Sequence, residues 1–245
     1  MNLIIDIGNT QIKAAFFENN KILRLKNSKT GEMEFITDLV SKYENIQHII
    51  ISSVREYPEK LVNSLQEKNR LVLFFNGEIE TPLENLYESK STLGYDRLAA
   101  CAGANSLYSN KNCLVIDAGT AITFDFVTEK NQYLGGCISP GLQMRFKALH
   151  HYTKKLPELM PDEDFHLIGK NTKEAIVSGV QNGLIFEIDS YIDNLQKKHS
   201  DLQVIITGGD ANFLSKHLTN MVDLQPQIVA IGLNKILEYN LLIRY

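Results

Sequence analysis

The sequence has few of the residues and patterns that mark membrane, disulfide-rich or metal-binding proteins. Its 245 residues include no tryptophan and only three cysteines, Cys101, Cys113 and Cys137, which lack the Cys-x-x-Cys spacing of a metal or redox site. We expect all three to be small core residues. No apolar run approaches the roughly 18 residues of a membrane span. The first residues lack the basic start of a signal peptide, so we expect a cytoplasmic protein with no membrane partner.

The chain also lacks an excess of positive charge. Lysine and arginine total 25 against 29 aspartate and glutamate, which gives a formal net charge of −4, and no segment gathers basic residues into a stripe. Nucleic acid is therefore not an expected partner. With 44% hydrophobic and 22% charged residues, the composition is that of an ordinary globular chain. Its length suits one large α/β domain or two smaller ones built to a common plan.

The common nucleotide-binding and nucleophile motifs are absent. The sequence contains no GxxxxGK[ST] P-loop, no GxGxxG after a strand and no GxSxG nucleophile turn. His150 and His151 are adjacent, so on a helix they point about 100° apart and cannot share a metal ion as residues four apart would. None of the six histidines is assigned a role. Any phosphate must therefore be bound by a different kind of loop.

Hydrophobic periodicity predicts the element order βββαβαβ for the first part of the chain. Gly8-Asn9 and Asn19-Asn20 supply the first two bends. The predicted strands are 3–5, 11–17, 22–25, 47–53 and 71–75; the predicted helices are 35–43 and one that starts near Pro58 and runs through Leu65. A polar stretch, 81–93, leads into a helix that begins near Asp96 and runs toward Tyr108.

The second part of the chain repeats the pattern of the first. Residues 114–120 echo residues 3–9 at an offset of 111 positions, and Glu18 falls on Glu129 at the same offset. Further predicted elements are a strand at 133–138, a helix at 172–195, a strand at 204–207 and a helix at 228–239. We interpret this as an internal duplication joined near residues 109–112. It predicts an α/β protein with two similar lobes, 1–110 and 111–245, and a ligand cleft between them.

The repeated strand ends carry an acid and a glycine. Asp6-Ile7-Gly8-Asn9-Thr10 places a carboxylate at the end of a buried strand and a glycine at the turn, where a backbone without Cβ can approach a phosphate closely. Lys13 adds a positive charge, and Asp6 can hold magnesium through water. Asp117-Ala118-Gly119-Thr120 repeats the acid and the glycine. A plain β-hairpin is the alternative for either turn.

Other motifs lie at the starts of predicted helices. Asp96 in Gly94-Tyr95-Asp96-Arg97 either stabilises the helix dipole or accepts a proton from a substrate hydroxyl, with Arg97 holding an anionic group. Gly135-Gly136 and Ser139-Pro140-Gly141-Leu142 bracket the end of a strand and the start of a helix. Gly208-Gly209-Asp210 suits an adenosine-binding turn or a helix cap equally well. Thr172, after Gly169-Lys170-Asn171, is an N-cap candidate that can also touch a substrate.

In this order along the chain, these motifs resemble those of the type III pantothenate kinase family. The resemblance implies a duplicated ribonuclease-H-like fold, that of the actin-like ATPases, within the acetate kinase, sugar kinase, Hsp70 and actin superfamily. It also implies a homodimer that phosphorylates pantothenate with ATP as the first step toward coenzyme A. Each motif is short, but together they extend from residue 6 to residue 210.

The resemblance also implies roles for individual residues. Asp96 is the proton acceptor, Asp117 holds a monovalent cation (potassium or ammonium), and Thr172 completes the pantothenate pocket from the partner subunit. The residues expected to bind ATP with Mg²⁺ are Asp6, Ile7, Gly8, Asn9, Thr10, Gln11, Ile12, Lys13 and Thr120, and those expected to bind pantothenate are Tyr87, Gly94, Tyr95, Asp96, Arg97 and Thr172.

Two alternatives stay open at the level of the sequence. The same fold can phosphorylate a sugar or acetate, although the chain is short for such kinases. It can also occur in a non-catalytic accessory or regulatory protein that keeps only the nucleotide turn. The joint presence of Asp6, Asp96, Asp117 and Thr120 favours a kinase.

Overall fold

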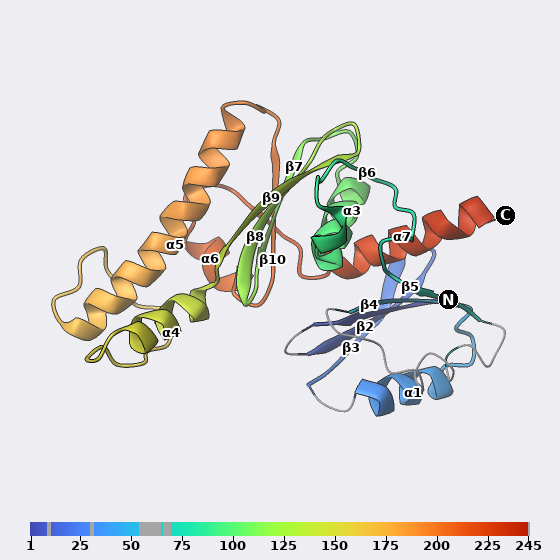
Figure 1. Ribbon diagram of the computed structural model, residues 1–245, viewed down its shortest axis with the longest axis horizontal. Coiled ribbons are helices and arrows are strands. Elements are labelled where there is room, and N and C mark those ends of the chain that lie inside the picture. The colour runs from blue at the N-terminus through green and yellow to red at the C-terminus, as the bar shows by residue number, and fades with distance from the viewer. Residues whose placement is uncertain (9–10, 30–31, 54–64, 66–69, 245) are drawn as a thin grey trace. The chain divides into compact units, whose positions relative to one another are not determined.

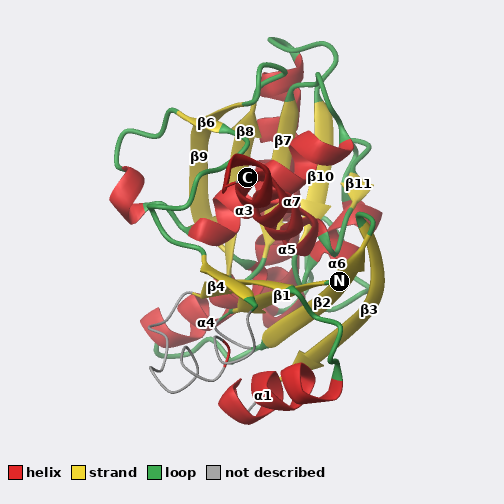
Figure 2. Ribbon diagram, turned by 90° about the vertical axis from the view of Figure 1, so that its right-hand side faces the viewer, coloured by secondary structure: helices red, strands yellow, loops and turns green. Residues whose placement is uncertain are grey.

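The computed structural model of the protein describes residues 1–8, 11–29, 32–53, 65 and 70–244. Its contacts separate the chain into two compact units. Unit 1 comprises Met1–Leu107, Asn131–Tyr133 and Gln227–Tyr245, and unit 2 comprises Tyr108–Lys130 and Leu134–Pro226. Both units contain helices and strands (Figures 1 and 2).

Unit 1 is built on a sheet with the strand order β3-β2-β1-β4-β5. Strands β1, β2 and β3 form an antiparallel meander, and β4 and β5 follow in parallel to β1. Their bounds are β1 (Asn2–Ile7), β2 (Ile12–Glu18), β3 (Lys21–Ser28), β4 (His48–Ser53) and β5 (Leu71–Phe74). All five predicted strands are confirmed. The predicted helix from Pro58 lies outside the described residues, apart from Leu65.

Alternate residues of this sheet face two different helical layers. Leu3, Ile5 and Ile7 of β1 pack in one core cluster with Ile36 and Leu39 of α1 (Glu32–Lys42), so α1 covers this face. The opposite face receives α3 (Tyr95–Leu107) and α7 (Ile228–Arg244), which pack on each other and on β1 and β4. The short β6 (Glu84–Asn85) and the 3₁₀ turn Lys90–Thr92 precede α3. The side chains of β1 that point away from α1 therefore lie on the face covered by α3 and α7.

Unit 2 repeats the strand order of unit 1. Its sheet runs β9-β8-β7-β10-β11, with β8 antiparallel to β7, and with β10 parallel to both β7 and β11. The first residues of β9 also pair with β6. The strands are β7 (Cys113–Ala118), β8 (Ala121–Val127), β9 (Gln132–Pro140), β10 (Gln203–Thr207) and β11 (Asp223–Leu224). Because third, second, first, fourth and fifth strands follow one another in both sheets, the duplicated ribonuclease-H-like fold is confirmed.

Three helices cover one face of the second sheet. They are α4 (Leu142–Tyr152), α5 (Thr172–Gln196) and α6 (Ala211–His217), and α5 runs along the sheet beside α4 (Figure 1). Their apolar side chains form one core cluster with Leu114, Ile116 and Ala118 of β7. Asp117 therefore points to the opposite face. In the described part of the chain, no helix combines the length and apolarity that crossing a bilayer requires.

The structure corrects two details of the sequence interpretation. Cys101 and Cys113 are buried, as predicted, but Cys137 is exposed, because it lies among the last residues of β9, most of which are exposed. Residues 119–121 lie between the last paired residues of the second hairpin, Ala118 and Ile122, whereas residues 8–11 lie between those of the first, Ile7 and Ile12. With one residue fewer in the second loop, the strand after it shifts by one position, so Glu18 and Glu129 are not equivalent.

Candidate functional site

The first acid-and-glycine turn carries a charged pair at a strand end. Asp6 lies near the end of β1, directly opposite Lys13 on β2 and beside Ser52 on β4. Cross-strand partners share one face of a sheet, so these three side chains lie on the face covered by α3 and α7. The N–H of Gly8 donates to the carbonyl of Gln11 at 3.1 Å and closes the turn. The expected ligand residues Asn9 and Thr10 lie outside the described residues.

The second acid-and-glycine turn repeats this position in unit 2. Asp117 lies opposite Thr123 on β8 and beside Thr207 on β10. The N–H of Gly119 donates to the carbonyl of Ala121 at 3.1 Å, and Thr120 lies between them. The shorter loop places Thr123 where the first turn has Lys13. In the sheet Asp117 therefore has Thr123 and Thr207 as neighbours, where Asp6 has Lys13 and Ser52.

The turn after β10 packs directly on the second hairpin. Gly208 has a φ of +100°, and a Cβ at this position would lie 2.6 Å from Oδ1 of Asp117. Only glycine can adopt this positive φ and also leave the space beside Asp117 without strain. The N–H of Asp210 donates to the carbonyl of Ala118 at 3.0 Å. The motifs 117–120 and 208–210, which are far apart in the sequence, thus form one loop cluster.

Asp210 holds the cap position of α6 without acting as a side-chain cap. No hydrogen bond joins its carboxylate to the first turn of the helix, and burial raises the pKa of this carboxyl. The capping alternative from the sequence analysis therefore accounts for where Asp210 lies but not for its carboxylate. Gly136 and Gly141 have a packing role: a Cβ on Gly141 would overlap the carbonyl oxygens of Gly119 and Thr120.

Asp96 and Arg97 meet at the start of α3. Oδ1 of Asp96 accepts the N–H of Arg97 at 2.8 Å, and the first helical hydrogen bond of α3 ends on the carbonyl of Gly94. A Cβ on Gly94 would lie 2.6 Å from the same Asp96 oxygen. Because Gly94 has no side chain, it leaves the space that the Asp96 carboxylate occupies at the helix end. The ring of Tyr95, the residue between Gly94 and Asp96, lies 5.2 Å from that of Phe75.

An aromatic side chain from the preceding loop joins this cluster. The guanidinium of Arg97 lies 5.7 Å from the centre of the Tyr87 ring, a cation–π distance, and only 7% of Arg97 is exposed. The structure thus brings together Tyr87, Gly94, Asp96 and Arg97, all in unit 1. A carboxylate and a buried guanidinium at one helix end can address a hydroxyl and an anionic group of the same small molecule.

Thr172 lies at the first residue of α5, and its predicted cap role is wrong. The cap is Asn171, whose side-chain oxygen accepts the N–H of Glu174 at 3.0 Å, while the Glu174 carboxylate accepts the N–H of Lys170 at 2.8 Å. Asparagine caps helices as well as threonine does, and a glutamate three residues later completes the reciprocal pair. These hydrogen bonds lower the pKa of the Glu174 carboxyl below its ordinary value, and the backbone N–H of Lys170 has the largest effect.

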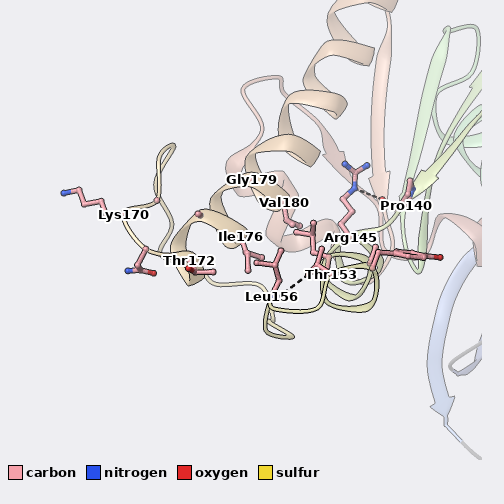
Figure 3. Close-up of a pocket in the computed structure, with 15 residues that line it drawn as sticks. Pro140, Arg145, Thr153, Leu156, Lys170, Thr172, Ile176, Gly179 and Val180 are labelled. Atoms are coloured by element: carbon pink, nitrogen blue, oxygen red, sulfur yellow. Dashed lines mark hydrogen bonds between the residues drawn. The ribbon is translucent and has the colours of Figure 1, made fainter.

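Thr172 lines a cavity of ≈1020 Å³ in unit 2. The cavity lies between α4, the first turns of α5 and the loop before α5 (Figure 3). Its walls are largely apolar, with Leu149, Leu156, Ile176 and Val180 among them. At its rim Arg145 donates to the carbonyl of Pro140 at 2.8 Å and pairs with Glu187. Sequence reasoning missed this cavity because α4 and the long loop after it carry little periodicity.

The acids at the two strand ends have the donor chemistry that a magnesium ion prefers. Asp6 and Asp117 offer carboxylate oxygens at strand ends, and hard cations prefer oxygen ligands. Gly208, packed closely against Asp117, leaves no room for a side chain beside that carboxylate. Among the described residues no group of three or more histidine, cysteine or acidic side chains is arranged to hold a metal ion.

Comparison with known proteins gives the same family as the motifs. The family model for type III pantothenate kinase matches residues 2–194. The type III pantothenate kinase of Flavobacterium johnsoniae is 40% identical over 242 residues, which cover 98% of this chain and 99% of that protein.

Solved structures give the same fold. A protein from Campylobacter jejuni, described as a Baf family transcriptional activator, has a TM-score of 0.63 at 24% identity and covers 97% of this chain and 98% of its own. A protein from Sinorhizobium meliloti, described as a 2-dehydro-3-deoxygalactonokinase, has a TM-score of 0.61 at 14% identity and covers 98% and 99%. Fold alone therefore spans several functions, and the sequence relationship decides among them: the chain belongs to the type III pantothenate kinase family.

Proposed function

We propose that this enzyme transfers the γ-phosphoryl group of ATP to the primary hydroxyl of pantothenate, giving 4′-phosphopantothenate, the first step of coenzyme A synthesis. The observation that carries the proposal is the cluster at the start of α3 in a member of this kinase family. Pantothenate has a hydroxyl to be phosphorylated and a carboxylate to be bound. Asp96 and Arg97 supply one matching group for each.

Phosphoryl transfer requires positioning and charge neutralisation more than covalent chemistry. Asp96 accepts the proton of the attacking hydroxyl, so its carboxylate must stay close to that oxygen. The N–H of Arg97 and the space left by Gly94 hold the carboxylate at the helix end. Arg97 binds the pantothenate carboxylate, and the residues that complete the acceptor pocket are Tyr87, Gly94, Tyr95 and Thr172.

The nucleotide is bound by the two acid-and-glycine turns. Residues 6–13 form the first phosphate loop, in which Lys13 offsets phosphate charge, and Thr120 of the second loop contacts the nucleotide. The magnesium that accompanies ATP neutralises the phosphate oxygens when bound, and Asp6 would hold it through water. We also propose that the chain divides as the repeat predicts, with residues 1–110 and 111–245 as the two duplicated halves.

A coupled ADP-release assay tests the function. We expect ADP release with pantothenate and no release with a panel of sugars or with acetate. Release with a sugar or acetate but not with pantothenate would make the enzyme a kinase for another acceptor. Silence with every acceptor would favour the accessory or regulatory alternative.

Gly94→Ala is expected to lower kcat by about 10- to 100-fold, because the new methyl group pushes the Asp96 carboxylate from its place. The melting temperature should change little, since the carboxylate end can move without disturbing the core. Gly77→Ala is the matched control: its Cβ would lie 3.7 Å from the Tyr95 hydroxyl, an ordinary contact, and kcat should stay within twofold of wild type. Equal kcat values for the two variants would contradict this account of Gly94.

Activity should depend on the monovalent cation. We propose that Asp117 holds potassium or ammonium, because its carboxylate lies at a strand end opposite Thr123 and beside Thr207, and hard cations prefer oxygen ligands. With sodium as the only monovalent cation, kcat should be on the order of tenfold lower and should return when potassium is added. Asp117→Asn should give the low rate in both salts. Equal wild-type rates in sodium and potassium would rule out the cation site.

We also propose a cytoplasmic homodimer in which Thr172 of one subunit completes the pantothenate pocket of the other. Asn171 already caps α5, so Thr172 has no cap role to perform. Unit 2 also exposes large apolar side chains, among them Ile138 (65% exposed) and Phe186 (57%), which a second copy would cover. Analytical ultracentrifugation of the purified enzyme measures the assembly, and a monomer at micromolar concentration would contradict it. Cell fractionation measures the compartment.

A further inference from the structure

Three residues from the second half of the chain are built into unit 1. Asn131–Tyr133 belong to unit 1, which contains α3, whereas the residues on either side of them in the sequence belong to unit 2. They form a short parallel ladder with β6, in which Glu84 pairs with Gln132 and Asn85 with Tyr133. The N–H of Leu86 donates to the carbonyl of Tyr133 at 3.0 Å. The loop that carries Tyr87 is therefore anchored by this segment.

The ring of Tyr133 lies behind the ring of Tyr87. Tyr133 is fully buried (0% exposed), and the two ring centres are 6.1 Å apart at an interplanar angle of 49°. Tyr87 lies in turn against the guanidinium of Arg97, 5.7 Å from it. The three side chains form a row from the core to the acceptor cluster. Tilted aromatic pairs of this kind stabilise a fixed ring orientation.

The same segment is also tied to α3. Nδ2 of Asn105, on α3, donates to Oδ1 of Asn131 at 2.7 Å. Asn131 has a φ of +61°, a left-handed conformation that asparagine tolerates better than most residues. Asn131–Tyr133 therefore contact both parts of the acceptor cluster: the loop of Tyr87 and the helix that begins with Asp96 and Arg97.

We propose that Tyr133 is a positioning residue for the acceptor substrate. It fixes the Tyr87 ring against Arg97, so that the pocket is formed before the substrate binds and less ordering is needed on binding. This inference rests on the proposed function, in which Tyr87 and Arg97 bind pantothenate. Its effect falls on acceptor binding rather than on the chemical step, because Asp96 is held separately by the N–H of Arg97.

Tyr133→Leu in the full-length enzyme tests the proposal. The KM for pantothenate should rise about 3- to 10-fold, the range that loss of one aromatic pair gives, while kcat and the KM for ATP stay within twofold of wild type. Tyr133→Phe keeps the ring and should restore the wild-type KM. Phe17→Leu, a buried substitution on β2 of the same unit, is the control for general destabilisation: it should lower the melting temperature and leave KM unchanged. If Tyr133→Leu does not fold, Tyr133→Met replaces it.

A double-mutant cycle with Tyr87→Ala separates positioning from a structural role. If Tyr133 acts through Tyr87, Tyr133→Leu should raise KM in the wild-type background and have no further effect in the Tyr87→Ala background. Additive effects on KM, or a fall in kcat at unchanged KM, would overturn the proposal.

The same measurements distinguish this proposal from the proposed function. Pantothenate turnover by wild type, with KM raised by Tyr87→Ala but not by Tyr133→Leu, would overturn only the role of Tyr133. Turnover of another acceptor would overturn the pantothenate assignment, and the cycle is then measured with that acceptor. Absence of turnover with every acceptor would overturn both.

Discussion

Asp96→Asn is expected to lower kcat for pantothenate phosphorylation by about 10²- to 10⁴-fold while the protein stays folded. Asparagine is nearly the same size as aspartate and keeps an oxygen that can accept the N–H of Arg97, the contact that Asp96 makes at 2.8 Å. It cannot take a proton from the attacking hydroxyl. The loss should therefore fall on kcat, while the KM for ATP and the melting temperature stay close to wild type.

The control for Asp96→Asn is the same change on the surface of the same unit. Asp38 lies on α1, where it forms an exposed ion pair with Lys42 at 2.8 Å. Because exposed pairs contribute little to stability, Asp38→Asn should leave both kcat and the melting temperature almost unchanged. Steady-state kinetics of the two variants decide the matter: near-normal turnover in Asp96→Asn would remove Asp96 from the chemical step.

The sequence predicts the strand framework well because both halves use the same local signals. A short continuous run of apolar residues ends in an acid and a glycine at Asp6-Ile7-Gly8 and again at Asp117-Ala118-Gly119. Each strand end then lies where the topology brings it beside the next parallel strand. The tetrad Gly94–Arg97 is also local, because four consecutive residues hold each other at one helix end. Local patterns of this kind can be predicted from the sequence because they do not depend on distant partners.

Features that depend on distant partners could not be predicted. Strand β6 has only two residues, and it exists because Gln132 and Tyr133 pair with it. Periodicity cannot reveal a two-residue strand, nor that residues 131–133 leave the second half of the chain for unit 1. The one-residue difference between the two hairpin loops was hidden for a related reason. A single offset applied across the loop assigns Glu129 to Glu18, whereas the strand register shows the shift.

The helix cap illustrates a choice between two suitable residues. Asn171 and Thr172 are both residues that cap helices well, and the prediction of Thr172 as the cap is wrong. Glu174 decides the outcome, because it lies three residues after Asn171 and its carboxylate accepts from both the Lys170 N–H and the Asn171 side chain. The capping-box spacing was present in the sequence and points to asparagine. The correction matters because Thr172, which does not cap α5, can then contribute to the pantothenate pocket as proposed.

Gly232→Ala is expected to cause the largest loss of stability. Helices α3 and α7 cross so closely that a Cβ on Gly232 would lie 2.7 Å from the carbonyl carbon of Ala99 and closer still to its oxygen. Gly103 faces this point from α3, and its own Cβ would meet the backbone of Ile228. Backbone atoms cannot move aside as a flexible side chain can, so the two helices must separate. We expect the free energy of unfolding to fall by about 3 kcal/mol or more.

Activity should fall together with stability in this variant. Helix α3 carries Asp96 and Arg97 on its first turn, and its position against the sheet depends on α7. The run of small residues at 99–104 is visible in the sequence, but only the structure shows that it faces a glycine on α7. Gly232→Ala should thus lower kcat even at temperatures where the protein remains folded.

Gly183→Ala is the matched control, because it makes the same change within a helix where nothing lies within 4 Å of the added methyl group. Alanine favours helix over glycine by up to about 1 kcal/mol, so this variant should unfold at the wild-type temperature or slightly above it. Thermal unfolding followed by circular dichroism compares the two variants directly. If Gly232→Ala unfolds at the same temperature as Gly183→Ala, the close crossing of α3 and α7 is not what holds the acceptor helix in place.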